Sequence, residues 1–143
     1  MEVATITEVL GGVEVLQKKI HNKMDLVELS NKGVKKDALL RLGKYLNLSI
    51  SQMADLVAIT ERTIQRYTLE KTFNRIVSEQ ILQIAEVAAK GTNTFGDKDK
   101  FLSWMHQPNK ALADKTPMSL LRSRFGTEMI LDELGRIEHG VFS

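Results

Sequence analysis

The sequence contains no cysteine, so it can form no disulfide bond and offers no thiolate as a nucleophile or zinc ligand. Its apolar runs are far too short to cross a bilayer. The opening Met1-Glu2 begins an acidic, mixed segment and not a basic signal region. These absences predict a cytoplasmic protein with no membrane partner.

A large excess of charge is also lacking. The chain has 20 basic and 18 acidic residues among 143, a formal net charge of +2, so it is no general binder of polyanions. Any contact with nucleic acid must therefore come from a local patch. The candidates are Arg62, Arg66, Lys71 and Arg75, with Lys35, Lys36, Arg41 and Lys44 as further candidates. The length allows one domain or two small ones.

Catalytic and metal-binding motifs are missing as well. His21, His106 and His139 are scattered without the spacing of a metal site. There is no glycine-rich phosphate loop and no nucleophile elbow. We expect neither a metal nor a cofactor, and no enzymatic activity. An enzyme with an unrecognised active site remains an alternative, which would require a convergent polar cluster.

What the sequence does contain is helical periodicity, without sustained strand alternation, and this predicts an all-α fold. Residues 1–12 lack a strong pattern and are expected to form a flexible or partner-ordered arm. Gly91 is expected to end a helix that starts at Ser78, and the polar stretch 91–100 to form a hinge between two helical lobes. The other predicted helices cover residues 13–21, 25–33, 36–47, 97–107, 116–126 and 127–140, with Asp25, Asp97, Thr116 and Thr127 as caps.

The stretch from Ser49 to Leu69 predicts a helix-turn-helix. Ser49 and Gln52 form a capping-box pattern at the start of the first helix, and Thr60 can cap the second. The small residue Ala54 allows a close crossing of the two helices. Ala58 occupies the turn, where glycine is frequent, so the turn is expected to be slightly different or mildly strained.

The second helix of this pair would be the recognition helix. Its polar side would face the major groove, where Arg pairs with guanine and Gln with adenine, while Thr60 and the helix end could bind a phosphate. A plain helical hairpin within a bundle is the alternative. The residues expected to contact DNA are Ser51, Gln52, Thr60, Glu61, Arg62, Thr63, Gln65, Arg66 and Lys71.

Two sets of motifs stand out in the sequence. The first half carries RTIQRY at Arg62 to Tyr67. The second half carries, in order, Phe95-Gly96-Asp97, Trp104, Pro108-Asn109, Leu112, Thr116-Pro117, Leu120-Leu121, Gly126 and the ending LGRIEHGVFS from Leu134 to Ser143. Together they resemble the Xre/ParS/MbcA antitoxins that neutralise RES-domain toxins: the first motif resembles that of their Xre-like region, and the second set follows their toxin-binding domain. Tyr67 and Ala113-Asp114 depart from the pattern of the family.

The resemblance implies a division into an N-terminal arm with short helices (1–33), an Xre-like helix-turn-helix domain (34–90) and a toxin-binding domain (91–143). It also implies a dimer that binds operator DNA, blocks the active site of a RES-domain, NAD-targeting toxin encoded by a neighbouring gene, and represses its own operon. The toxin-binding residues it implies are Trp104, Arg136, Ile137, Glu138, His139, Gly140, Val141, Phe142 and Ser143. A stand-alone dimeric transcriptional regulator is the alternative.

Overall fold

The structure is a computed structural model, and it describes residues 4–140. Within this range the chain is helical, with two isolated β-bridges and no strand, so the predicted all-α fold is confirmed. The helices are α1 (Ile6–Val9), α2 (Val13–Leu16), α3 (Lys23–Lys32), α4 (Lys36–Tyr45), α5 (Ile50–Leu56), α6 (Glu61–Arg66), α7 (Arg75–Phe95), α8 (Lys98–Met105), the 3-10 helix η1 (Lys110–Leu112), α9 (Pro117–Leu120) and α10 (Arg124–Glu138).

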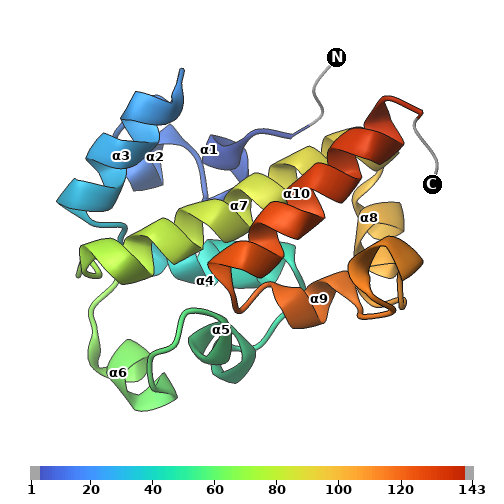
Figure 1. Ribbon diagram of the computed structural model, residues 1–143. Coiled ribbons are helices and arrows are strands. Elements are labelled where there is room, and N and C mark those ends of the chain that lie inside the picture. The colour runs from blue at the N-terminus through green and yellow to red at the C-terminus, as the bar shows by residue number, and fades with distance from the viewer. Residues whose placement is uncertain (1–3, 141–143) are drawn as a thin grey trace.

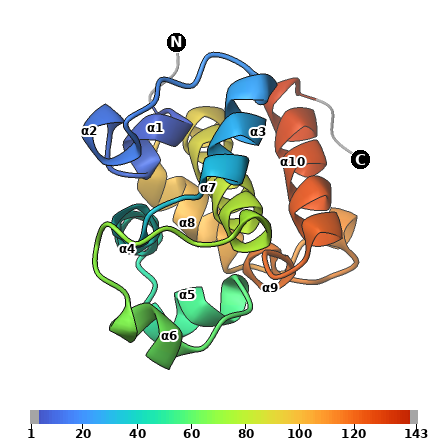
Figure 2. The ribbon, with the colours of Figure 1, turned by 90° about the vertical axis from the view of Figure 1, so that its left-hand side faces the viewer.

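Helix α7 is the centre of the fold. It crosses the middle of the molecule in Figure 1, and α10 lies alongside it in both views (Figures 1 and 2). Its 21 residues correspond to about 30 Å of helix at 1.5 Å per residue. It contacts α1, α3, α8 and α10. Ile81, Ile84 and Ala88 are completely buried in these contacts, so α7 supplies the middle of the hydrophobic core.

The predicted end of a helix at Gly91 is wrong. Helix α7 continues through Gly91 and ends at Gly96, which adopts a left-handed conformation with φ 71° and donates its N–H to the carbonyl of Thr92. Residues 91–95 are therefore helical where a hinge was expected.

The glycine at position 91 serves packing and not helix termination. A Cβ there would overlap the ring of Phe101, which is completely buried against this turn of α7. The next residue, Thr92, is also buried, and its Oγ1 lies 2.6 Å from the hydroxyl oxygen of Tyr45 in α4. Contacts with α8 and α4 thus hold this part of α7 in the core.

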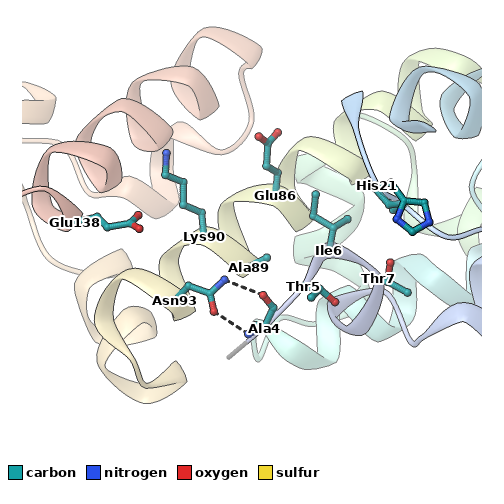
Figure 3. A pocket seen from close by; sticks show the side chains of 11 residues that line it. Ala4, Thr5, Ile6, Thr7, His21, Glu86, Ala89, Lys90, Asn93 and Glu138 are labelled. Carbon is teal, nitrogen blue, oxygen red and sulfur yellow. Dashed lines mark hydrogen bonds between the residues drawn. The ribbon is translucent and has the colours of Figure 1, made fainter. Parts of the chain in front are cut away.

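The first residues of the described range are packed, contrary to the expected flexible arm. Val9 and Leu10, at the end of α1, are almost completely buried. Ala4 is fixed to α7, since its backbone N–H donates to Asn93 Oδ1 and its carbonyl accepts from Asn93 Nδ2, both at 2.8 Å (Figure 3). The N-terminal segment is therefore part of the core structure from residue 4 onward.

Two predictions for the following segment are also wrong. The helix expected over residues 13–21 ends at Leu16, because Gln17 takes a left-handed conformation with φ 56°. The cap of α3 is Asn22 and not Asp25. Asp25 is the third helical residue, and it completes a capping box by accepting the backbone N–H of Asn22.

Helix α10 begins earlier than the sequence predicts. Its cap is Ser123, whereas the expected cap Thr127 lies inside the helix and is buried. Gly126 belongs to the first turn, and a Cβ there would overlap the carbonyl oxygen of Leu120. The close approach of α9 to α10 therefore explains this glycine. The predicted caps Asp97 and Thr116 are confirmed.

Candidate functional site

The helix-turn-helix is built as its caps predict. Ser49 Oγ accepts the backbone N–H of Gln52, and Gln52 Oε1 accepts the backbone N–H of Ser49, so the capping box of α5 is complete. Thr60 caps α6 by accepting the N–H of Thr63. Met53, Ala54 and Ile64 are buried between the helices and the rest of the core. This hairpin lies at the bottom of the molecule in both views (Figures 1 and 2).

The turn between these helices carries backbone strain, as the sequence predicts. Ala58 has φ 59°, in the left-handed region that glycine occupies without a steric penalty. The following residue, Ile59, donates its N–H to the carbonyl of Ala54 and packs partly buried against the core. The packing of Ile59 thus fixes the path of the turn, although the left-handed conformation is unfavourable for Ala58.

The arginines on the exposed side of α6 differ from the other arginines of the chain in having no ion-pair partner within residues 4–140. Five of the seven arginines pair with a carboxylate, namely Arg41, Arg75, Arg122, Arg124 and Arg136. The other two, Arg62 and Arg66, are exposed on α6 and have no ion-pair partner among residues 4–140. Two guanidinium groups one helical turn apart are therefore available to phosphate or to base edges.

The remaining predicted DNA-contacting residues surround these arginines. Ser51 and Gln52 are exposed in the first turn of α5, and Glu61 and Gln65 are exposed on α6, where Gln65 Nε2 lies 3.4 Å from Glu61 Oε1. Thr63 is partly buried, with its hydroxyl oxygen 2.8 Å from that of Thr60. Lys71 follows α6 and lies over the ring of Tyr67, at 5.6 Å from the ring centre.

The basic patch proposed from sequence is smaller than expected. Arg75 pairs with Glu79 at 2.9 Å, and Lys35 pairs with Glu70 at 2.6 Å. Lys36 donates to the carbonyl of Tyr67 at 2.8 Å and so supports the end of α6. Among the candidate residues, Arg41, Arg75 and Lys35 are paired with a carboxylate, whereas Arg62, Arg66, Lys36, Lys44 and Lys71 have no carboxylate partner within residues 4–140.

Of the residues predicted to bind a toxin, those from Arg136 to Gly140 lie where α10 finishes, at the top of Figures 1 and 2 and opposite the helix-turn-helix. Arg136 is exposed and pairs with the buried Glu133 at 2.8 Å. Ile137 is partly buried, while Glu138 and the C-cap residue His139 are exposed. Gly140 has φ 72°, a left-handed conformation that does not continue the helix. The predicted residues Val141, Phe142 and Ser143 lie outside the described range.

Trp104 lies on α8, which is far from α6 in Figure 1. Its ring packs against Phe95, at the end of α7, with the ring centres 5.6 Å apart and the planes tilted by 45°. The side chain is partly buried, so part of its surface remains for a partner. Phe95 thus packs against an apolar neighbour although it lies in a polar stretch of the sequence.

Two apolar side chains on α10 were not recognised in the sequence as surface residues. Phe125 is 78% exposed. Met129, Ile130, Leu134 and Ile137 form an apolar stripe in the sequence, yet Met129 is 42% exposed, while Ile130 and Leu134 are completely buried. The four-residue spacing of Phe125 and Met129 places them on one face of α10.

A charged cluster joining α7 to α10 was also missed. Glu79 accepts hydrogen bonds from Arg75 and from Arg124. Burial raises the pKa of the Glu79 carboxyl, but the hydrogen bonds and charges of Arg124 and Arg75 outweigh this effect and lower the pKa below its ordinary value. The carboxylate is therefore the junction between the starts of these two helices.

No arrangement for catalysis is apparent within residues 4–140. That range contains no group of three or more His, Asp or Glu residues that could hold a metal ion. A pocket of about 480 Å³ lies beside α1 and α7, and its rim includes His21, Glu86, Lys90 and Glu138 (Figure 3). Its charged side chains point in different directions in Figure 3 and do not converge on one point. No helix of the described range is long and apolar enough to cross a membrane.

Comparison with known proteins decides the family. The chain is 31% identical over 120 residues to the antitoxin Xre of Yersinia enterocolitica. The match covers 82% of this chain and 81% of the relative. The chain belongs to the Xre antitoxin family. A second relative, the antitoxin Xre of Photorhabdus laumondii, is 31% identical over 105 residues, covering 70% of this chain and 71% of the relative.

Two family models divide this Xre antitoxin along α7. The model described as the antitoxin Xre-like helix-turn-helix domain matches residues 25–86, and that of the antitoxin Xre/MbcA/ParS C-terminal toxin-binding domain matches residues 90–140. In the crystal structure of the M. tuberculosis MbcT-MbcA toxin-antitoxin complex, one chain shares the fold, with a TM-score of 0.55 and 20% identity over 87% of this chain and 100% of that chain. The Xre antitoxin is thus a component of a toxin-antitoxin system with a helix-turn-helix, and not an enzyme.

Proposed function

We propose that this Xre antitoxin blocks the active site of a RES-domain, NAD-targeting toxin encoded by a neighbouring gene, and represses its own operon through α6. The partner class rests on the resemblance of Trp104, Thr116-Pro117 and the ending from Leu134 to known antitoxins of such toxins. The family models support a toxin-binding and a helix-turn-helix region. The solved MbcT-MbcA structure is a toxin-antitoxin complex in which one chain has the fold of this protein, and this also supports a toxin as the partner.

The observation that carries the proposal is that α7 separates the exposed side of α6 from the C-terminal end of α10. Arg62 and Arg66 face solvent on α6, while Glu138 and His139 face solvent at the end of α10. Helix α6 and the C-terminal end of α10 lie at opposite ends of the molecule in both views (Figures 1 and 2). A protein that docks at the end of α10 would therefore leave α6 open to DNA.

For repression we propose a homodimer. A helix-turn-helix reads only a few base pairs, and dimers of this class read two half-sites about 34 Å apart or a multiple of that distance. Arg66 would contact a base edge, and Arg62 a base edge or a phosphate. Because such contacts release counterions from the phosphates, affinity should fall with added salt.

For toxin inhibition we propose that the segment after Gly140 enters the active-site cleft. Gly140 turns the chain at the end of α10, and Ile137, Val141 and Phe142 would supply apolar contacts, with Phe142 as the anchor. An aromatic anchor at the centre of an interface can cost about 2 kcal/mol or more when truncated to alanine. Arg136 and Glu138 would fix the register of the complex.

Co-expression with the neighbouring open reading frame tests the function. The full-length antitoxin should restore growth, co-purify with the toxin and preserve cellular NAD. An antitoxin lacking residues 140–143 should release toxin activity and still bind promoter DNA, since the deletion removes no residue of α10. Phe142→Ala should weaken inhibition more than the exposed control Lys115→Ala. Full protection by the truncated chain would rule out the tail as the blocking element, and a promoter bound in the absence of any toxin gene would indicate a stand-alone regulator.

A further inference from the structure

The outer face of α10 carries an apolar pair that the core does not use. Phe125 is 78% exposed and Met129 is 42% exposed, and the two follow each other at one helical turn. Their neighbours Gly126, Thr127 and Ile130 make the contacts with the rest of the protein. Exposed aromatic and methionine side chains in one patch are enriched at protein interfaces and are unfavourable in water.

The same face carries charges of defined sign. Glu128 and Asp132 are exposed beside the apolar pair, and neither is ion-paired within residues 4–140. Arg136 follows Met129 by seven residues, two helical turns, and therefore lies on the same side of α10. We define this outer face as Phe125, Glu128, Met129, Asp132 and Arg136. It presents an apolar pair next to two free carboxylates and leads to the end of α10.

We propose that the outer face of α10 is the main docking surface for the toxin, with Phe125 as its anchor, so that the toxin binds along the helix as well as at the chain end. This inference rests on the proposed function. Phe125 and Met129 fall within residues 90–140, which match the toxin-binding family model, and lie outside the part that matches the helix-turn-helix model. The face is also continuous with Arg136.

The charges of the outer face favour the toxin, and not a second copy of the chain, as the protein that binds there. A cleft that binds the phosphates of NAD is lined by cations, and Glu128 and Asp132 would meet such cations when the toxin docks. A symmetric dimer built on this face would bring four carboxylates, Glu128 and Asp132 from each copy, into one interface, where the only guanidinium groups of the face, those of Arg136, already pair with Glu133. The toxin surface that fits is therefore an apolar pocket bordered by Lys or Arg.

The test uses the full-length antitoxin and the toxin encoded by the neighbouring gene. Phe125→Ser combined with Met129→Ser should weaken the complex at least tenfold, as measured by calorimetry with a catalytically inactive toxin. The matched control is Ile76→Ser, which changes a 69% exposed apolar residue at the start of α7, outside the toxin-binding match. Glu128→Lys with Asp132→Lys should slow association and reverse its dependence on salt.

Additional measurements separate the possible failures. Circular dichroism and promoter binding should be unchanged in the double Ser variant, because both side chains lie on the surface. If the wild-type chain does not bind the toxin, the proposed function fails. If the wild-type binds and the double Ser variant binds equally well, the docking surface is wrong while the function stands. If the variant changes from dimer to monomer in light scattering and retains toxin affinity, a second copy occupies this face and the inference is overturned.

Discussion

The side chain of Asn93 hydrogen-bonds both backbone groups of Ala4, a residue 89 positions earlier in the chain. The two bonds, each 2.8 Å long, pair the amide with the backbone as a neighbouring strand would. They fasten the first described residues to the last turns of α7, beside the pocket in Figure 3. The N-terminal segment is thereby held against the half of the protein that matches the toxin-binding model.

The first prediction concerns this link. Asn93→Ala removes the donor and the acceptor that satisfy Ala4, so the free energy of unfolding should fall by about 1–3 kcal/mol. Chemical denaturation followed by circular dichroism measures the change. Asn31→Ala is the control, since Asn31 is exposed on α3, and it should alter stability by less than about 0.5 kcal/mol. Equal effects of the two substitutions would show that the link contributes nothing.

The second prediction compares two helical glycines. Gly91→Ala places a methyl group against the Phe101 ring, and the resulting overpacking should destabilise the protein by about 1–3 kcal/mol despite the better helix propensity of alanine. Gly135→Ala on α10 adds a methyl group 3.5 Å from Lys90 Nζ, an ordinary contact. That variant should be stabilised by up to about 1 kcal/mol. Thermal unfolding of both variants would reveal the opposite signs, and a stabilised Gly91→Ala would contradict the packing argument.

The third prediction concerns DNA. Arg66→Ala should weaken operator binding by about 1–3 kcal/mol if the guanidinium pairs with a base edge, and should leave the fold intact. Arg136→Ala removes the same charge at the other end of the molecule and is the control. Gel-shift titrations of the promoter fragment at several salt concentrations measure both. Unchanged binding by a triple Ala variant of Arg62, Gln65 and Arg66 would exclude α6 as the recognition helix.

The fourth prediction concerns the strained turn of the helix-turn-helix. Ala58 pays a steric cost of about 1–2 kcal/mol in its left-handed conformation, which glycine avoids. Glycine also has more conformational freedom to lose on folding, which offsets about 0.5–1 kcal/mol of this gain. Ala58→Gly should therefore raise the free energy of unfolding by about 0.5–1 kcal/mol. A lower melting temperature of this variant would mean that Ala58 makes contacts that outweigh its strain.

The fifth prediction follows from the lowered pKa of Glu79. Its folded-state pKa lies below the ordinary value of 4.5, so ionisation of Glu79 favours the folded protein at neutral pH. This contribution is present above about pH 4.5 and is lost as the pH falls through the folded-state pKa. Glu79→Gln should be less stable by about 0.5–1 kcal/mol at pH 7, and the difference should shrink below pH 4.5. A difference that does not vary with pH would exclude the ion pairs with Arg75 and Arg124 as its cause.

Local chemistry allowed the sequence to predict most helix starts. Ser49, Thr60, Asp97 and Thr116 were identified as caps because a cap bonds to N–H groups only two or three residues ahead. The apolar residues Ala38, Leu39 and Leu42 recur at helical spacing in the sequence, and in α4 they are completely buried. Two predicted caps were wrong: Asn22 and Ser123 cap α3 and α10 in place of Asp25 and Thr127.

The sequence by itself thus determined the all-α class, the helix-turn-helix and the family resemblance, since each depends on residues close together in the chain. Tertiary structure decided the role of glycine at Gly91 and Gly126, where the sequence indicated helix ends and the fold required a close approach of Phe101 and of the Leu120 carbonyl. It also decided which arginines remain free and that Phe125 faces solvent. These outcomes depend on pairs of residues from different helices, and only the packing of those helices around α7 brings such pairs together.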